Sequence, residues 1–119
     1  MGESAVMVSH IYSATENGQR FEVSRRGSSQ PGLIALAIEP AAGKGQMVCG
    51  EVDRRELNKA RFTGRAMEIA EDLSVQYRVI SNGFSAQIGF LFGFKQGAES
   101  RSLFIDQDSL GWLLSEDES

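Results

Sequence analysis

The two halves of the chain resemble each other, and this repetition limits the possible folds more than any other feature. The segment Val52–Leu57 matches Ile105–Leu110, since each reads as an apolar residue, an aspartate and then a leucine four positions after the aspartate. Two strand-like segments also match further upstream: Arg20–Val23 with Gln76–Val79, and Leu33–Ile38 with Gln87–Phe92. We therefore expect two copies of one unit, over residues 5–62 and 65–115, packed as a single domain (residues 1–119) in which each copy shields the apolar face of the other.

Short alternating runs of apolar and polar residues predict β-strands in both halves. The expected strands are residues 5–12, 20–25, 33–39 and 46–52 in the first half, and 74–80, 85–95 and 101–106 in the second. Two Asn-Gly pairs, Asn17-Gly18 and Asn82-Gly83, are typical of tight hairpin turns because both residue types tolerate positive φ. Residues 27–32 and 40–45 combine glycine with proline and predict loops.

The longest alternation predicts which face of one strand is buried. Within residues 85–95, one face carries Ala86, Ile88, Phe90, Phe92 and Phe94. We expect the phenylalanines of this row to pack in the core. Cys49 is expected to lie on a central strand as a small buried apolar side chain.

The first half ends in a helix signal. Asp53 followed three positions later by Glu56 is a capping-box pattern, in which two side chains satisfy backbone N–H groups at the start of a helix. It predicts a helix over residues 54–62, with Leu57 and Ala60 turned inward.

A second helix signal follows the last strand. Either Asp106 or Asp108 caps it, and three leucines are expected to face inward: Leu110, Leu113 and Leu114. Residues 65–73 fit a helix by composition and a strand by alternation, and the repeat favours the strand. The chain is thus predicted to be an α+β protein, mainly antiparallel β-sheet, built from two ββββα units.

This element order resembles a known architecture. Two ββββα units in one short chain resemble the Whirly and Pur-type single-stranded nucleic-acid-binding domains, and one unit resembles the PC4-type coactivator, which dimerises to reach the same shape. The resemblance is topological and covers most of the chain, while the lysine-rich motif of plant Whirly proteins and the strongly basic balance of Pur-type domains are absent. It implies curved sheets that bind single strands through aromatic and basic residues, without assigning that role to particular positions.

Charge and composition narrow the function classes. The 119 residues carry a net charge of −4, with nine basic and seven acidic residues in 1–65 and three basic and nine acidic residues in 66–119. Such a balance does not favour sequence-blind binding of duplex DNA, which depends on neutralising phosphates. The chain shows no signal peptide and no apolar run near the ~20 residues of a membrane helix, and its one cysteine fits a reducing cytoplasm.

No motif predicts catalysis or a cofactor. One cysteine and one histidine, Cys49 and His10, are too few for a zinc site. The Gly43-Lys44-Gly45 turn lacks the earlier glycine and the following Ser or Thr of a phosphate-binding P-loop. We therefore expect a non-enzymatic protein without a metal or cofactor.

Basic and aromatic residues suggest single-stranded DNA or RNA binding as the function. Arginine binds phosphate bidentately, and bases stack on aromatic rings. The candidate phosphate-binding residues are Arg20, Arg25, Arg26, Lys44, Arg54, Arg55, Arg61 and Arg65, and the candidate stacking residues are Tyr12, Tyr77 and Phe84.

The alternative is an acidic protein–protein interaction module, such as a small inhibitor or adaptor encoded by a phage. It would act through a sheet edge and through the apolar helix that carries Leu110 and Trp112, because tryptophan is frequent at binding hot spots. Exposed strand edges also pair between subunits, so a homo-oligomer is expected in either case.

Overall fold

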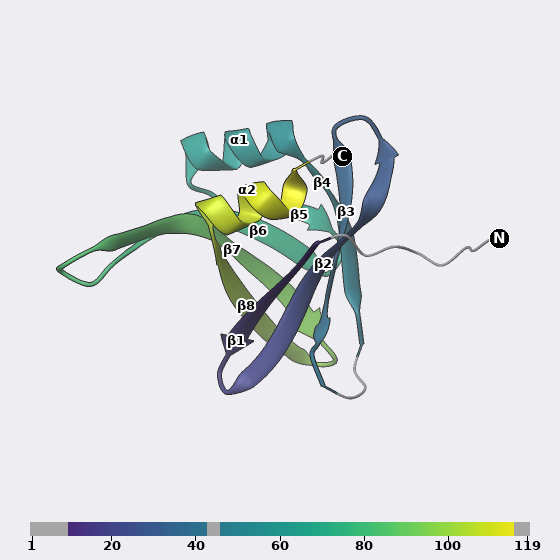
Figure 1. Cartoon of the computed structure of the whole chain (residues 1–119), viewed down its shortest axis with the longest axis horizontal. Helices are drawn as coiled ribbons and strands as arrows, with labels where there is room; N and C mark the ends of the chain where they lie inside the picture. Colours follow the sequence, from purple (N-terminus) through teal and green to yellow (C-terminus); the bar gives the residue numbers. More distant parts are fainter. Residues whose placement is uncertain (1–9, 43–45, 116–119) are drawn as a thin grey trace.

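The computed structural model describes residues 10–42 and 46–115, and it confirms the predicted α+β fold with two ββββα units. The first unit forms a four-stranded antiparallel sheet in the order β1-β2-β3-β4, followed by helix α1 (Figure 1). Its elements are β1 (His10–Glu16), β2 (Gln19–Gln30), β3 (Leu33–Pro40), β4 (Val48–Asp53) and α1 (Arg54–Thr63).

The second unit repeats this order, with sheet order β5-β6-β7-β8 and then helix α2. Its elements are β5 (Met67–Ala70), β6 (Leu73–Ser81), β7 (Ala86–Gln96), β8 (Glu99–Asp106) and α2 (Gln107–Leu114). The stretch 65–73, which was open between helix and strand, therefore contains strand β5 and the turn into β6. Residues 5–9 of the first expected strand and residues 43–45 of the second expected loop lie outside the described residues.

Both helices begin at the predicted aspartates. Asp53 accepts a hydrogen bond from the backbone N–H of Arg55 (2.9 Å), and Asp106, rather than Asp108, accepts one from Ser109 (3.0 Å). Satisfying these N–H groups fixes where each helix starts. The leucine four positions after each cap is buried in both helices.

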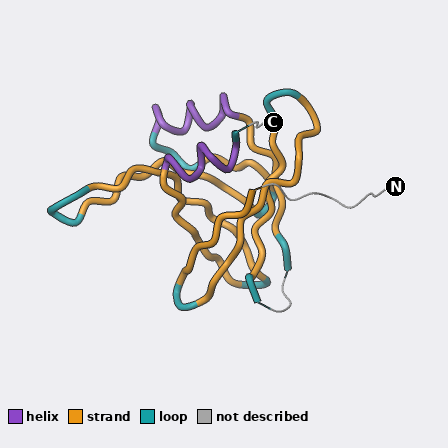
Figure 2. Tube along the Cα trace, viewed as in Figure 1, coloured by secondary structure: helices purple, strands orange, loops and turns teal. Residues whose placement is uncertain are grey.

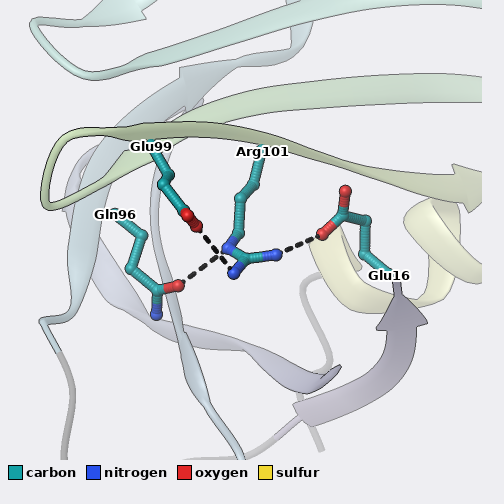
Figure 3. A network of polar contacts seen from close by, with 4 residues as sticks. All are labelled: Glu16, Gln96, Glu99 and Arg101. Atoms are coloured by element: carbon teal, nitrogen blue, oxygen red, sulfur yellow. Dashed lines mark hydrogen bonds and ion pairs between the residues drawn. The ribbon is translucent and has the colours of Figure 1, made fainter. Parts of the chain in front are cut away.

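The two sheets share one core, which takes side chains from both units. Phe21 and Phe94 meet edge to face across it, with ring centroids 5.3 Å apart. Where the sheets meet at their edges, β4 lies beside β5 and β1 beside β8. At the second of these seams Arg101 donates hydrogen bonds to Glu16 (2.9 Å), Glu99 (2.9 Å) and Gln96 (2.8 Å) (Figure 3).

Three sequence predictions are corrected. Residues 27–32 are not one loop, because β2 continues to Gln30 through an irregular register at Gly27, whose φ is +116°. Cys49 is exposed on β4, an edge strand of its sheet, because Val52 and the other alternate residues take the inward face. The matches between the halves are shifted in register. Ile34 corresponds to Phe90, since Ile34 lies opposite Val52 and Phe90 opposite Ile105. Val23, opposite Ile38, corresponds to Leu73, opposite Phe94, rather than to Val79.

Both helices lie on the same side of the molecule, as the purple segments in Figure 2 show. Each covers part of the sheets: α1 packs against β4 and β6, and α2 packs against β1, β2, β7 and β8. Within residues 10–42 and 46–115, neither helix has the length and apolar character needed to cross a membrane. The helices stop short of the far end of the β6–β7 hairpin, which projects from the body (Figure 1).

Candidate interaction surface

The β6–β7 hairpin forms an arm, defined here as residues 79–88. Beyond Val75, β6 has no β5 partner, and before Gly89, β7 has no β8 partner, within the described ranges. The arm is therefore a two-stranded ribbon that only its own cross-strand hydrogen bonds hold together. Its tip is closed by Asn82, whose side-chain oxygen accepts hydrogen bonds from the backbone N–H groups of Phe84 (3.1 Å) and Ser85 (3.0 Å).

The arm exposes apolar side chains that a single copy does not cover. Phe84 at the tip is 98% exposed. Val79 and Ile88 lie directly opposite each other, on the face that continues the core positions Tyr77 and Phe90. The apolar residues at alternate positions of β7 therefore share one face, as alternation predicts. Only the phenylalanines on this face are buried, because the rest of the protein does not cover the sheet at Ile88.

The arm carries no charged residue. Its sequence is Val-Ile-Ser-Asn-Gly-Phe-Ser-Ala-Gln-Ile, in a chain with 28 charged residues among 119. Exposed apolar side chains on ordinary surfaces are scattered singly, whereas several on one short segment without charges are typical of an interaction site. On the arm, Val79 and Ile88 share one face and Ile80 lies on the other. The large apolar residues exposed on the arm are Val79, Ile80, Phe84 and Ile88.

Aromatic and basic side chains gather at the base of the arm, where α1 ends. Phe62 is 91% exposed and lines a cavity of about 480 Å³ together with Asn58, Arg61 and Tyr77. The guanidinium carbon of Arg61 lies 5.8 Å from the centroid of the Tyr77 ring, a cation–π distance. Of the residues predicted for nucleic-acid binding, this surface brings together Arg61 and Tyr77 near the arm that carries Phe84.

Beside the arm's base, a groove of about 230 Å³ runs between the two helices. Leu57 of α1, Leu110 and Leu114 of α2 and Phe90 of β7 supply its apolar lining. Arg61 and Gln107 are among its polar lining residues. The groove and the 480 Å³ cavity share Asn58 and Arg61, so they adjoin each other.

Two of the predicted phosphate-binding arginines have an internal role. Arg25 on β2 donates a hydrogen bond to the backbone oxygen of Ser115, and Arg54 at the start of α1 donates one to the backbone oxygen of Leu114. Both oxygens belong to the C-terminal end of α2, where cations are favourable because unpaired carbonyls carry partial negative charge. These arginines therefore fasten the second unit's helix to the first unit.

The other predicted cations are dispersed. Arg26 donates to the hydroxyl of Ser24 (3.2 Å) and lies 3.7 Å from Glu39. Arg55 lies 4.0 Å from Asp53 at the beginning of α1. Arg20 is exposed on β2 beside the β1–β2 turn. Arg65 is exposed after α1, next to Gly64, whose backbone oxygen accepts a hydrogen bond from Gln76 of β6. Lys44 lies outside the described residues.

Tyr12 faces inward rather than toward solvent, since it packs against the core. Burial raises the pKa of its hydroxyl, the negative charge of Asp106 raises it further, and a hydrogen bond with Ser109 opposes both effects. The structure thus places Tyr12 partly buried beside the start of α2, close to Asp106 and Ser109.

The two α2 residues predicted to contact a partner differ in their exposure. Leu110 is buried in the core, because it is the inward leucine that follows the Asp106 cap. Trp112 is about half exposed and packs against the ring of His10, with centroids 4.6 Å apart. A partner could therefore reach Trp112 without reaching Leu110.

Sequence reasoning missed Val79, Ile80 and Ile88 as surface residues. Alternation indicates which residues share a face of a strand, but it does not indicate how far along the strand that face is covered. These apolar residues of the arm were therefore expected to lie in the core. A usable signal was the absence of charge from residues 79–88.

No cluster of three or more His, Cys, Asp or Glu side chains suited to a metal ion occurs in the described part of the chain. Comparison of the chain with protein-family models, with curated proteins and with solved structures finds no match.

Proposed function

We propose that this protein is a non-enzymatic interaction module that binds a protein partner through the arm. The observation that carries the proposal is the 98% exposure of Phe84 at the tip of a ribbon without charged side chains. Aromatic side chains are enriched at the centre of protein–protein interfaces and dominate their binding energy.

Energetics favour a covered arm. A two-stranded hairpin that stands alone in water is at best marginally stable. Burying one large apolar side chain contributes roughly 1.5–3 kcal/mol. A partner that covers Phe84, Val79 and Ile88 would gain this energy and would also hold the ribbon in place.

The test places a photo-crosslinking amino acid at position 84 and, in a matched control, at Asn17 in the β1–β2 turn. Both positions are exposed hairpin tips, and only the first belongs to the arm. We expect a discrete protein adduct after illumination from position 84 and none from position 17. Absence of an adduct from position 84, or equal adducts from both positions, would refute the proposal.

The second candidate function is single-stranded nucleic-acid binding at the base of the arm. It is favoured by the position of Arg61 over the Tyr77 ring, with Arg65 exposed just after the same helix. Arginine and aromatic side chains together bind phosphates and stack bases.

Fluorescence polarisation of a labelled oligonucleotide tests this second candidate. Binding should be saturable, should weaken steeply with salt, and should fall in Arg61→Gln and Arg65→Gln but not in Arg20→Gln, which lies on another hairpin. If the oligonucleotide does not bind even at low salt, this candidate is eliminated.

A further inference from the structure

We infer that the partner of the arm is a second copy of this chain, and that two arms pack face to face in antiparallel orientation. In this arrangement Phe84 of each copy reaches the base of the other arm, at the mouth of the groove between α1 and α2. The inference rests on the proposed function and adds the identity of the partner.

The chain itself supplies both halves of such a contact. One half is the exposed Phe84 on the uncharged tip. The other half is the apolar lining of the 230 Å³ groove, formed by Leu57, Phe90, Leu110 and Leu114, with exposed Phe62 beside its entrance. A surface that holds both a protruding and a receiving apolar part is self-complementary, as the symmetric interface of a dimer requires.

A copy cannot insert Phe84 into its own groove. From Tyr77 at the base to Phe84 at the tip the strand spans about 20 Å, given its rise of about 3.4 Å per residue. The arm also points away from the helices rather than folding back over them (Figure 1). When two arms are antiparallel, each tip meets the other base, because tip and base are separated by the same length in both copies.

The rest of the arm fits the same arrangement. Val79 and Ile88 lie opposite each other where the arm begins, on the face that continues the core, and Ser81 and Ala86 form the next pair on that face. Between antiparallel arms, Val79 and Ile88 of one copy would lie near Ser81 and Ala86 of the other. The apolar side chains of this face would then be removed from water in both copies.

The distribution of charge selects the antiparallel orientation. Residues 79–88 contain no charge, so two identical arms meet without repulsion even though each chain carries a net charge of −4. At the base lie three arginines, Arg61, Arg65 and Arg78, and one aspartate, Asp106, which pairs with Gly89, so the charge there is net positive. Parallel arms would bring these cations of the two copies together, whereas antiparallel arms keep them about 20 Å apart.

The first part of the test measures the mass of the purified full chain by analytical ultracentrifugation over roughly a hundredfold range of concentration. We expect a concentration-dependent dimer. Phe84→Ser should raise the dissociation constant at least about tenfold, as expected for an aromatic residue at an interface centre. Ile11→Ser is the matched control, since Ile11 is an exposed apolar residue on β1 away from the arm, and it should leave the constant unchanged.

The second part tests the orientation in a Cys49→Ser background, which removes the native exposed thiol. Phe84→Cys and Asn58→Cys chains are mixed and oxidised. Antiparallel arms should give a disulfide between the two different chains, because Asn58 lies at the shared edge of the groove and the cavity. Far-UV circular dichroism and Trp112 emission confirm that each variant is folded.

The outcomes separate this inference from the proposed function. A monomer at every concentration, a dimer unaffected by Phe84→Ser, or a disulfide only between two Phe84→Cys chains would overturn the antiparallel dimer. If the chain is monomeric and position 84 crosslinks to a different protein, the proposed function stands and the second copy is excluded. If position 84 forms no adduct, either in the purified chain or in a cell extract, both proposals fail.

Discussion

At the scale of single residues, long-range contacts decide what each arginine does. Arg54 and Arg55 are neighbours in sequence, yet only Arg54 donates to the backbone oxygen of Leu114 at the end of α2. Arg55 lies 4.0 Å from Asp53, and its side chain is 87% exposed. Composition cannot distinguish two such residues, because the distinguishing partner is 60 positions away for one of them.

We predict that Arg54→Ala destabilises the fold by about 1.5–3 kcal/mol, the cost of losing a hydrogen bond to a charged group. The C-terminal end of α2 would lose the guanidinium that donates a hydrogen bond to the backbone oxygen of Leu114. Arg55→Ala should change stability by less than about 0.5 kcal/mol, since exposed ion pairs contribute little. Urea unfolding followed by Trp112 emission measures both variants, and equal losses in the two would contradict the assignment.

Asp106 makes the free energy of unfolding depend on pH in the acidic range. Hydrogen bonds from the side chain and backbone of Ser109 lower the pKa of its carboxyl group below the ordinary value of 3.8. Because the folded-state pKa is the lower one, the ionised carboxylate stabilises the fold above the ordinary pKa. This contribution is lost as the pH falls through the folded-state pKa.

The expected outcome is a free energy of unfolding that decreases below about pH 4, with a smaller decrease in Asp106→Asn. Asparagine also caps helices, so the variant keeps the cap while removing the titration. Urea unfolding at a series of pH values from neutral to acidic compares the two proteins. Identical acid dependence would show that Asp106 does not contribute.

At the scale of elements, close approach of strands fixes where the arm leaves the body. A Cβ atom at Gly89 would lie 2.3 Å from the backbone oxygen of Ile105 and 2.7 Å from the Cα atom of Asp106. Backbone atoms cannot yield as a flexible side chain can. Gly89 therefore allows β7 and β8 to pack tightly at the last pair before the arm.

We predict that Gly89→Ala destabilises the fold by about 1–3 kcal/mol, the range expected when a packed site is overfilled. Gly111 on α2 is the control, because a Cβ atom there meets nothing within 4 Å. Gly111→Ala should be neutral or stabilising by up to about 1 kcal/mol, since alanine is the better helix former. Thermal unfolding of both variants tests this difference in sign.

Much of the element order follows from the sequence, because its causes are local. Alternation and the Asn17-Gly18 pair predict the strands and a hairpin, and Asn17 and Gly18 have the expected positive φ values of 55° and 83°. The Asp53 cap predicts the start of α1. The extension of β2 to Gln30 is not predictable in this way, because pairing with β3 overrides the local preference of a glycine and serine stretch for a loop.

The candidate site was predictable only in part. Tyr77 and Phe84 were identified as accessible aromatic residues, and Phe84 is fully consistent with that prediction. The role of Val79 and Ile88 depends on where the helices stop covering the sheet, which is a property of the assembled fold. Sequence patterns predict which side chains share a face of a strand or helix. Whether that face is exposed also depends on which other elements pack against it.

At the scale of the whole molecule, the two units are joined at the seams between their sheets. Arg101 on β8 reaches across to Glu16 on β1 (Figure 3), and its side chain is only 18% exposed. A largely buried guanidinium with several partners holds the seam more firmly than an exposed ion pair would.

Arg101→Met is expected to lower the free energy of unfolding by about 1.5–3 kcal/mol, because it leaves Glu16 without this charged hydrogen bond. Glu99→Gln, which changes the more exposed partner of the same arginine, should cost less than about 1 kcal/mol. Chemical denaturation ranks the two variants. A larger loss in Glu99→Gln would show that the seam is not where the stability lies.

At this scale, we infer that a second copy of the chain covers the arm. Amide hydrogen–deuterium exchange at low and high protein concentration tests it most directly. We predict that protection of residues 79–88 rises with concentration, while the β1–β2 turn at Asn17-Gly18 exchanges equally fast at both. Exchange in the arm that stays equally fast at every concentration would contradict the claim.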